Sequence, residues 1–226
     1  MKAAANSGRC ASGALRLDRS FAAILLCSIT TNLPRRLRTA KLGMRNKPET
    51  GENKMRKVTF GVANSLDNFI ARTDHAVDWL VWDDEVAAIT AEFWKTIDTV
   101  VMGRKTYEGL RQSGMTSYPG VRNYVFSRTM KEPPDEKVEI IREDAAAFVR
   151  DLKSREGAGI CVMGGGELAK SLFEACLIDE VGLNIQPVLL GSGIPLFYEM
   201  SRQIELELLD CKVLKNRGVF VSYRVK

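Results

Sequence analysis

From residue 55 onward, short apolar runs alternate with stretches in which apolar residues recur every three or four positions. The runs are rich in Val, Ile and Phe, and they predict β-strands over residues 58–63, 99–102, 121–126, 138–141, 158–163 and 180–188. Helices are predicted over residues 83–96, from residues 107–110 onward, and over residues 145–153 and 167–176. In the first helix Val86, Ile89 and Phe93 share one face, and Asp83 stands where a carboxylate suits the positive helix end.

Strands that alternate with helices are typical of a parallel sheet covered by helices on both faces. The last two predicted strands, 205–214 and 218–225, are joined by a short turn and read as an antiparallel hairpin. We therefore predict one α/β domain over residues 55–226, with three layers and a mostly parallel central sheet that ends in an antiparallel C-terminal hairpin. Ligands of such sheets bind at the carboxyl ends of the strands.

Residues 1–54 differ from the rest of the chain in charge. They carry eleven Lys/Arg and three Asp/Glu, a net charge of +8, whereas residues 55–226 carry 22 and 25, a net charge of −3. The overall basic character is therefore no reason to expect that the domain binds nucleic acid. We predict that residues 1–54 form a basic leader, either disordered or a targeting segment. An organelle transit peptide, a poor secretory signal, a dispensable leader and a basic arm for nucleic acid all stay open.

The segment Cys161-Val-Met-Gly-Gly-Gly-Glu-Leu168 takes a buried strand into three glycines and then directly into a helix. Glycines let a phosphate approach the backbone, and exposed N–H groups with the helix dipole stabilise its negative charge. The spacing does not match the GxGxxG motif: Gly157 and Gly159 would be its first two glycines, but Val162 occupies the position of the third. It does not match the P-loop either, because no Gly-Lys-Ser/Thr is present. The residues alone leave phosphate binding and a merely tight turn as alternatives.

Two further strand ends carry polar groups that suit phosphate. Gly103 breaks an apolar strand and is followed by Arg104, Lys105 and Thr106. The strand 121–126 is followed by Ser127 and Arg128. Arginine beside a hydroxyl suits a phosphate monoester such as the 2′-phosphate of NADP, whereas solvated charge at a helix start is the alternative.

Taken in order, these segments resemble the dihydrofolate reductase-like superfamily, and most closely the C-terminal reductase domain of the bifunctional riboflavin-biosynthesis deaminase–reductase. The matching segments are Ser65-Leu-Asp-Asn-Phe-Ile-Ala71, Val77-Asp-Trp79, Val101-Met-Gly-Arg-Lys-Thr-Tyr-Glu108, Val125-Phe-Ser-Arg128, Val162-Met-Gly-Gly-Gly-Glu-Leu168 and Pro187-Val-Leu-Leu-Gly-Ser-Gly-Ile-Pro-Leu-Phe197. They span essentially the whole domain.

The resemblance implies NADPH as the cofactor. It places Gly103, Arg104 and Thr106 at the phosphates, and Ser127 and Arg128 near the adenosine 2′-phosphate. It also implies a pyrophosphate turn, where relatives have a cis Gly-Gly peptide. The residues of that turn and of the helix start after it are Gly164, Gly165, Gly166, Glu167 and Leu168.

Other positions depart from the family or keep two interpretations. Asn68 replaces a usual glycine, but asparagine tolerates left-handed backbone, so the turn is expected to survive. The helix carboxylate that faces the pterin in dihydrofolate reductases is missing, because Thr90 falls near its place, and this argues against folate. Asp67 is our candidate for contacting the substrate or relaying a proton, with a plain Asx-turn as the alternative. Trp79, Trp82 and Trp94 are expected in the core, with stacking on a flat ring as the alternative.

Cysteine and histidine usage predicts no metal site. The five cysteines are widely spaced without a CxxC pair, and His75 is the sole histidine. Buried, reduced thiols are the expected state, which fits a cytoplasmic protein.

We therefore predict an NADPH-dependent reductase that transfers hydride to a small heterocyclic or sugar-linked pyrimidine-like substrate. It would be similar to 5-amino-6-(5-phosphoribosylamino)uracil reductase of riboflavin biosynthesis. The alternatives are a non-catalytic dinucleotide-binding module and dihydrofolate reductase proper. The resemblance implies a homodimer, and beyond the small-molecule substrate neither nucleic acid nor membrane is expected as a partner.

Overall fold

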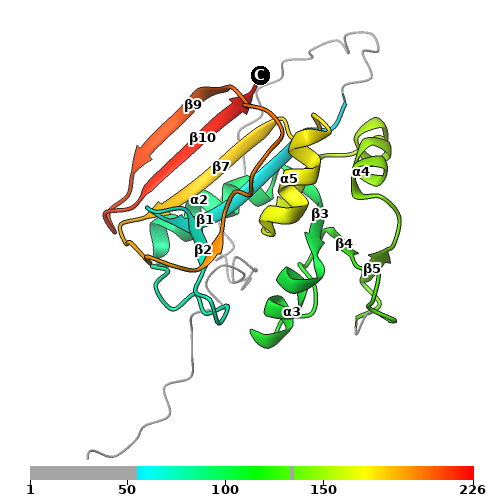
Figure 1. The fold of residues 1–226 in the computed structure, drawn as a ribbon, viewed down its shortest axis with the longest axis horizontal. Coiled ribbons are helices and arrows are strands. Elements are labelled where there is room, and N and C mark those ends of the chain that lie inside the picture. Colours follow the sequence, from blue (N-terminus) through cyan, green and yellow to red (C-terminus); the bar gives the residue numbers. More distant parts are fainter. Residues whose placement is uncertain (1–54, 133–134) are drawn as a thin grey trace, which may run out of the picture.

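The computed structural model describes residues 55–132 and 135–226, so the leader predicted for residues 1–54 lies outside the described part. An eight-stranded sheet crosses the molecule in the order β5-β4-β3-β6-β1-β7-β10-β9 (Figure 1). Its strands are β1 (Val58–Ser65), β3 (Ile97–Gly103), β4 (Arg122–Phe126), β5 (Val138–Ile141), β6 (Gly159–Met163), β7 (Glu180–Gln186), β9 (Leu206–Val213) and β10 (Val219–Val225).

Strand directions confirm the predicted fold class. The pairs β5–β4, β4–β3, β3–β6, β6–β1 and β1–β7 are parallel, whereas β10 is antiparallel to both β7 and β9. A second sheet pairs β2 (Phe69–Ala71) with β8 (Ile194–Pro195). β8 is not among the strands predicted from the sequence, because a two-residue strand carries no periodic pattern of its own.

Four helices complete the three layers: α2 (Asp84–Trp94), α3 (Arg104–Gln112), α4 (Ala145–Ser154) and α5 (Gly166–Glu174). Two apolar clusters fill the space between helices and sheet, and alternate strand residues face each of them. One cluster joins α4 and α5 to the sheet through side chains such as Val149 and Leu172. The other joins α3 to the opposite face through Tyr107 and Leu110, with Phe93 of α2 packed against it.

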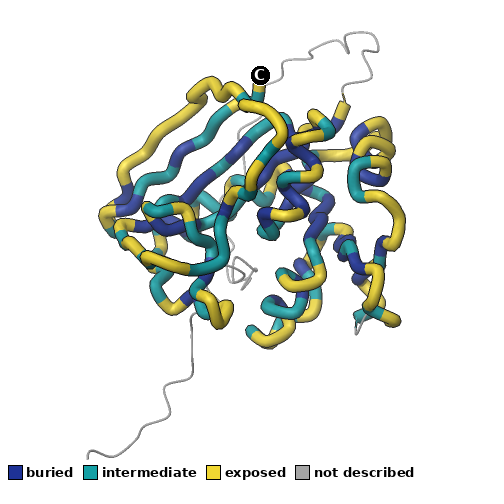
Figure 2. Tube along the Cα trace, in the orientation of Figure 1, coloured by how far each residue is buried: buried dark blue, intermediate teal, exposed yellow. Residues whose placement is uncertain are grey.

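Buried backbone runs through the middle of the sheet, and exposure rises toward its edges (Figure 2). Among the described residues, no helix combines the length and the apolar character needed to cross a bilayer. The register aligns Gly103 at the end of β3 with Phe126 at the end of β4, so both strands finish at one rim of the sheet. That rim positions the candidate site.

Candidate functional site

Two glycine turns meet at the carboxyl ends of the adjacent parallel strands β3 and β6. Gly103 ends β3, and Gly164 and Gly165 follow β6 with φ angles of 59° and 76°. A Cβ placed on Gly164 would lie 3.3 Å from the Thr106 hydroxyl oxygen, so this turn lies close to the first turn of α3, which follows Gly103. The polar strand ends predicted from the sequence therefore converge on one rim. No peptide bond is cis in the described residues, so the glycine turn is trans throughout.

A cleft of about 820 Å³ opens at this rim. The ends of β1, β3, β4 and β6 and the starts of α3 and α5 line it. Every cofactor position predicted from the sequence is in the lining: Gly103, Arg104, Thr106, Ser127, Arg128, Gly164, Gly165, Gly166, Glu167 and Leu168.

The two helices that begin in the cleft differ from the other two at their first turns. Asp83 and Asp144 cap α2 and α4, each accepting a hydrogen bond from a backbone N–H of the first turn. The caps of α3 and α5 are Gly103 and Gly165, which have no side chain with which to accept such a bond. First-turn N–H groups are left to an outside acceptor, and the helix dipole favours an anionic one.

Gly166 has no room for a side chain. A Cβ there would lie 2.6 Å from the carbonyl oxygen of Leu196 and 2.7 Å from the Tyr198 ring. The start of α5 is thus packed tightly against the segment after β8. A Cβ at Gly164 or Gly165 would instead point toward Thr106, at 3.3 Å and 3.6 Å from its hydroxyl oxygen. The absence of Cβ atoms there forms a cradle in which a phosphate can approach the backbone.

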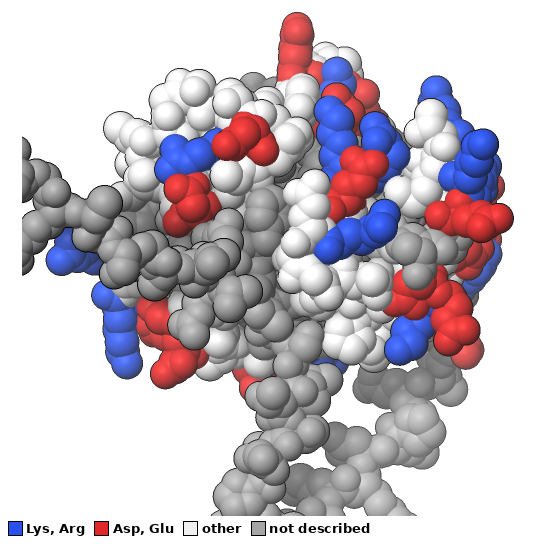
Figure 3. All heavy atoms as spheres, turned by 90° about the horizontal axis from the view of Figure 1, so that it is seen from below, with Lys and Arg blue, Asp and Glu red and all other residues white. Residues whose placement is uncertain are grey.

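Cations of the cleft are only partly neutralised. Arg104 donates to Glu108 one turn later on α3, at 2.6 Å. Within residues 55–132 and 135–226, Lys105 and Arg128 have neither a hydrogen-bond nor an ion-pair partner. Viewed from below, the described residues show basic and acidic side chains intermingled, with no continuous basic patch among them (Figure 3). This suits recognition of a few charged groups on a small ligand better than binding of a polyanion.

Ser127 combines burial with a local role. It is 8% exposed, and its hydroxyl accepts from the backbone N–H of Met130 at 3.0 Å and of Thr129 at 3.3 Å. The Arg142 guanidinium donates to the Met130 carbonyl at 2.8 Å, so the segment after β4 is held from two sides. These bonds fix the backbone from which Arg128 projects into the cleft.

Another part of the cleft is apolar and contains two titratable groups that are not among the site residues predicted from the sequence. Its apolar lining consists of Val62, Ala63, Ile70, Ala71, Val77 and Ile194. Asp74 and His75 lie beside these residues, and His75 has a left-handed φ of 70°. The loop is closed by a backbone bond from Arg72 N–H to the Ala76 carbonyl at 2.8 Å and by the Arg72–Asp78 ion pair.

Asp67 does not line the cleft. Its carboxylate accepts hydrogen bonds from the Ser65 hydroxyl at 2.5 Å, from Leu190 N–H at 3.1 Å and from Gly191 N–H at 2.7 Å. The Ser65 hydrogen bond, followed by those from Gly191 and Leu190, lowers the pKa of Asp67 below its usual range. The geometry therefore favours the turn alternative: Asp67 joins the β1–β2 turn to the distant loop 187–193, and its expected substrate contact gains no support.

The tryptophans also lie outside the lining of the cleft. Trp94 stacks on Tyr118 with ring centroids 5.1 Å apart, and it packs beside the cluster under α3. No group of three or more His, Cys, Asp or Glu side chains within the described residues could hold a metal ion.

The amino-acid sequence is similar to those of known proteins. A family model described as the RibD C-terminal domain covers residues 56–220. Two curated relatives come from Bacillus subtilis strain 168, and both are named as uncharacterized proteins. YwjB is 38% identical over 159 residues, covering 70% of this chain and 91% of the relative. YyaP is 28% identical over 186 residues, covering 77% of this chain and 97% of the relative.

Solved structures agree with the family model. A putative riboflavin biosynthesis protein from Shewanella sp. PV-4 superposes with a TM-score of 0.68 at 25% identity, over 75% of this chain and 99% of that one. A diaminohydroxyphosphoribosylaminopyrimidine deaminase/5-amino-6-(5-phosphoribosylamino)uracil reductase from Thermotoga maritima reaches 0.59 at 17% identity. That match covers 77% of this chain and 58% of the bifunctional one, and at this identity it speaks for the fold.

Proposed function

This chain belongs to the family of RibD C-terminal domains, and from that premise we propose that it is an NADPH-dependent reductase. The proposed reaction transfers hydride to a small heterocyclic or sugar-linked pyrimidine-like substrate. One observation supports this above all: a single cleft brings together the glycine turns, the two uncapped helix starts and two unpaired cations. That is the combination a phosphorylated dinucleotide requires.

The residues present fit the cofactor. The cradle at Gly164 and Gly165, with the N-terminus of α5, would hold the pyrophosphate. Arg104 and Thr106 at the start of α3 would contact phosphate oxygens, and Arg128 would contact the 2′-phosphate that distinguishes NADPH from NADH. When bound, the cofactor supplies the hydride, and the protein supplies placement and exclusion of water.

The apolar part of the cleft would receive the substrate ring. Val62, Ala63 and Ile70 offer a surface without charge, on which a flat heterocycle can lie. Asp74 and His75 are the nearby side chains able to exchange a proton, so they replace Asp67 as our candidates for proton transfer. No residue of α2 lines the cleft, and this speaks against the dihydrofolate reductase alternative, in which a helix carboxylate faces the pterin.

The state of the thiols supports a proposal on the compartment. Cys161, Cys176 and Cys211 are all free. Cys161 is buried as predicted, whereas Cys176 and Cys211 are exposed, so the expectation of buried thiols is wrong for these two. Unpaired, accessible cysteines suit a reducing environment, and we extend the proposal to a cytoplasmic protein.

The cofactor is tested by thermal shift of the full chain with NADPH and with NADH. NADPH at a hundredfold excess over its dissociation constant should stabilise the protein by about 2.7 kcal/mol, and NADH should stabilise it less. The preference should shrink in Arg128→Ala, whereas Arg104→Ala should reduce stabilisation by both cofactors. Stabilisation and preference should both persist in Arg111→Ala, which removes an exposed arginine of the same helix as Arg104 that does not line the cleft. Equal shifts from both cofactors, or none from either, would contradict the proposal.

Turnover is tested by following NADPH oxidation with pterin, pyrimidine and quinone-like acceptors. Oxidation with a pyrimidine-like acceptor is the expected result. Tight binding of NADPH without oxidation across all three classes would instead identify a non-catalytic dinucleotide-binding module.

A further inference from the structure

The cleft reaches the apolar cluster that joins α3 to the sheet. Three described residues belong both to that cluster and to the lining of the cleft: Leu110, Tyr118 and Met163. Tyr118 lies in the segment between α3 and β4, and it is 4% exposed. This wall of the cleft therefore combines two apolar side chains with a phenol.

The wall that contains Tyr118 lies on the same face of the sheet as Ala63, one of the residues assigned to the substrate ring. Side chains two positions apart share a face of a strand, so Ala63 lies on the face of Gly61. A Cβ on Gly61 would be 3.8 Å from the Cys161 sulfur, and Cys161 belongs to the same cluster as Tyr118. Tyr118 is thus placed to meet a ring that lies on Ala63.

Packing and hydrogen bonds hold Tyr118 in place. Its ring stacks on Trp94 of α2, with centroids 5.1 Å apart and an angle of 28° between the ring planes. Its backbone N–H donates to Asn123 Oδ1 at 2.8 Å, and Asn123 Nδ2 donates to the Tyr118 carbonyl at 2.9 Å. Asn123 is itself buried at the start of β4. The phenol is therefore positioned before a ligand arrives, which reduces the entropy lost on binding.

The Tyr118 hydroxyl has no hydrogen-bond partner within residues 55–132 and 135–226. Tyr107 of α3 offers a comparison, since it belongs to the same cluster and its hydroxyl is also unpaired. The Tyr107 hydroxyl is fully enclosed away from the cleft, whereas the Tyr118 hydroxyl is not enclosed and its residue lines the cleft. A ligand that fills the cleft must give the Tyr118 hydroxyl a partner in place of solvent, or leave it unpaired at a cost in affinity.

The Tyr118 hydroxyl is suited to donate that bond. Burial raises the pKa of Tyr118 well above its ordinary value, so the phenol keeps its proton at neutral pH. A protonated phenol donates one hydrogen bond. In an apolar wall, such a donor favours a ligand edge with a carbonyl oxygen or a ring nitrogen over a hydrocarbon edge.

We propose that Tyr118 is a specificity residue of the substrate site, where it donates a hydrogen bond to a carbonyl oxygen or ring nitrogen of the heterocycle. The inference rests on the proposed reductase function, because it concerns the substrate end of the same cleft. Tyr118 acts on which ring binds, and the hydride comes from the cofactor. A site with a fixed donor discriminates because the wrong ring leaves that donor unpaired.

The test compares two rings of similar shape by isothermal titration of the full chain. The first is 5,6-diaminouracil, and the second is 1,2-diaminobenzene, which has the same adjacent amino groups and no carbonyl. The unaltered protein should bind the uracil more tightly. Tyr118→Phe should reduce this preference about three- to tenfold, the effect of one neutral hydrogen bond. Tyr107→Phe is the matched control, because it removes the enclosed hydroxyl of the same cluster, and it should keep the preference.

Both variants should melt within about 2 °C of the unaltered protein, since neither hydroxyl has a partner in the described chain. A preference that survives in Tyr118→Phe, or that falls equally in Tyr107→Phe, would overturn the proposal. Equal binding of the two rings, or no binding of either at millimolar concentration, would overturn it as well. A lower melting temperature in Tyr118→Phe alone would show that its hydroxyl has a structural partner instead.

The stabilisation by NADPH separates this inference from the reductase proposal. It should be the same in Tyr118→Phe, in Tyr107→Phe and in the unaltered protein, because neither tyrosine is among the residues assigned to the cofactor. Its absence from all three proteins would contradict the reductase proposal. Normal stabilisation by NADPH without any ring preference would contradict only the role of Tyr118.

Discussion

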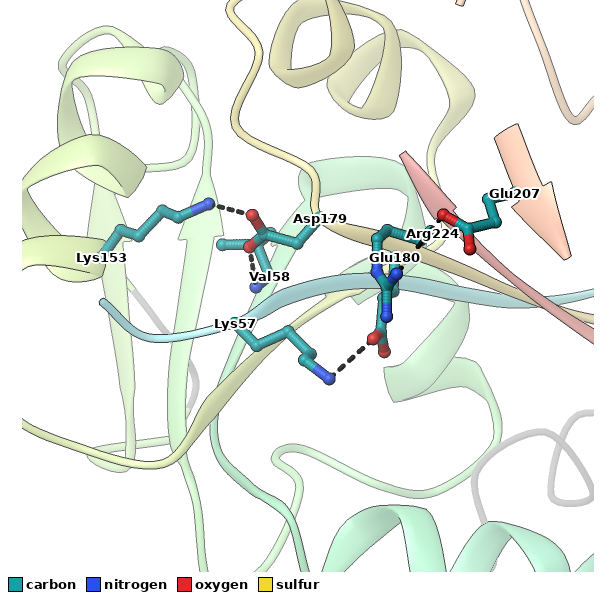
Figure 4. A network of polar contacts seen from close by, with 7 residues as sticks. All are labelled: Lys57, Val58, Lys153, Asp179, Glu180, Glu207 and Arg224. Atoms are coloured by element: carbon teal, nitrogen blue, oxygen red, sulfur yellow. Dashed lines mark hydrogen bonds and ion pairs between the residues drawn. The ribbon is translucent and has the colours of Figure 1, made fainter. Parts of the chain in front are cut away.

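The two ends of the sheet differ in whether their charged side chains are paired within the protein. At the amino end, buried Arg56 donates to Asp98. Lys153 pairs there with Asp179, and Lys57 pairs with Glu180 (Figure 4). At the carboxyl end, Lys105 and Arg128 line the cleft with no partner among the described residues. A charge satisfied inside the protein stabilises the fold, and a charge left unsatisfied at a cleft is available to a ligand. Of the four predictions that follow, Asp98→Ala and Arg128→Ala test this division directly, and Gly166→Ala and Asp67→Asn test the structure around the cleft.

Gly166→Ala should have the largest effect, because it disturbs both packing and binding. The new methyl group would lie 2.6 Å from the Leu196 carbonyl oxygen. Because this oxygen is a backbone atom, the clash is relieved only if the backbone moves. We expect a loss of about 2–4 kcal/mol in unfolding free energy, measured by denaturant titration, together with weakened NADPH binding.

Gly103→Ala is the matched control for that variant. Gly103 also lines the cleft, but a Cβ there would meet nothing within 4 Å. Its unfolding free energy should stay within about 1 kcal/mol of the unaltered protein. Equal stability of the two variants would show that the start of α5 can relax and would contradict the tight packing we describe.

Asp98→Ala should affect stability alone. The Asp98 carboxylate accepts from the Arg56 guanidinium and from Ala158 N–H, and Arg56 is only 3% exposed. Burial already lowers the pKa of Arg56. Removing Asp98 leaves that cation with only Thr99 and the Ala158 carbonyl as partners. We expect a loss of about 2 kcal/mol, below the range for fully buried pairs because the Asp98 side chain is 40% exposed.

The control for this variant is Asp151→Ala, which breaks the exposed Asp151–Arg155 pair at the C-terminal end of α4. It should change the unfolding free energy by no more than about 0.5 kcal/mol. NADPH affinity of the folded protein should be unchanged in both variants. A large loss of affinity in Asp98→Ala would mean that the two ends of the sheet are coupled.

Arg128→Ala should weaken NADPH binding and leave stability nearly unchanged, the reverse of the effect expected for Asp98→Ala. Since Arg128 has no partner in the described chain, unfolding free energy should change by less than about 0.5 kcal/mol. NADPH affinity should fall about ten- to a hundredfold in a fluorescence titration, with NADH affinity nearly unchanged. Arg122→Ala removes an exposed arginine at the other end of the same strand and should alter neither affinity. A weaker NADH complex in Arg128→Ala would move this residue away from the 2′-phosphate.

The sequence predicted those features of the site that depend on residues close to one another along the chain. The ten positions predicted to bind the cofactor lie directly after apolar strands or at the starts of helices, so parallel topology alone brings them to one rim. Asp67 shows where this reasoning stops. Its hydrogen-bond partners Leu190 and Gly191 are more than 120 residues away along the chain, and no local sequence pattern predicts that contact. Asp74 and His75 were likewise not predicted as site residues, because the folding of a loop, and not strand periodicity, brings them to the cleft.

Asp67→Asn should have the smallest effect and should separate a turn from a catalytic group. Hydrogen bonds from Ser65, Gly191 and Leu190 depress the pKa of Asp67 below 3.8, its value in an unfolded chain. Its stabilising contribution is therefore complete above about pH 4 and is lost as pH falls through the lower folded value. The variant should melt no more than about 2–3 °C below the unaltered protein from pH 5 to 8, and the difference should shrink below pH 4. NADPH oxidation should keep its kcat, because Asp67 lies outside the lining of the cleft. An unchanged melting temperature with lost turnover would restore Asp67 to the reaction and move the proton donor away from Asp74 and His75.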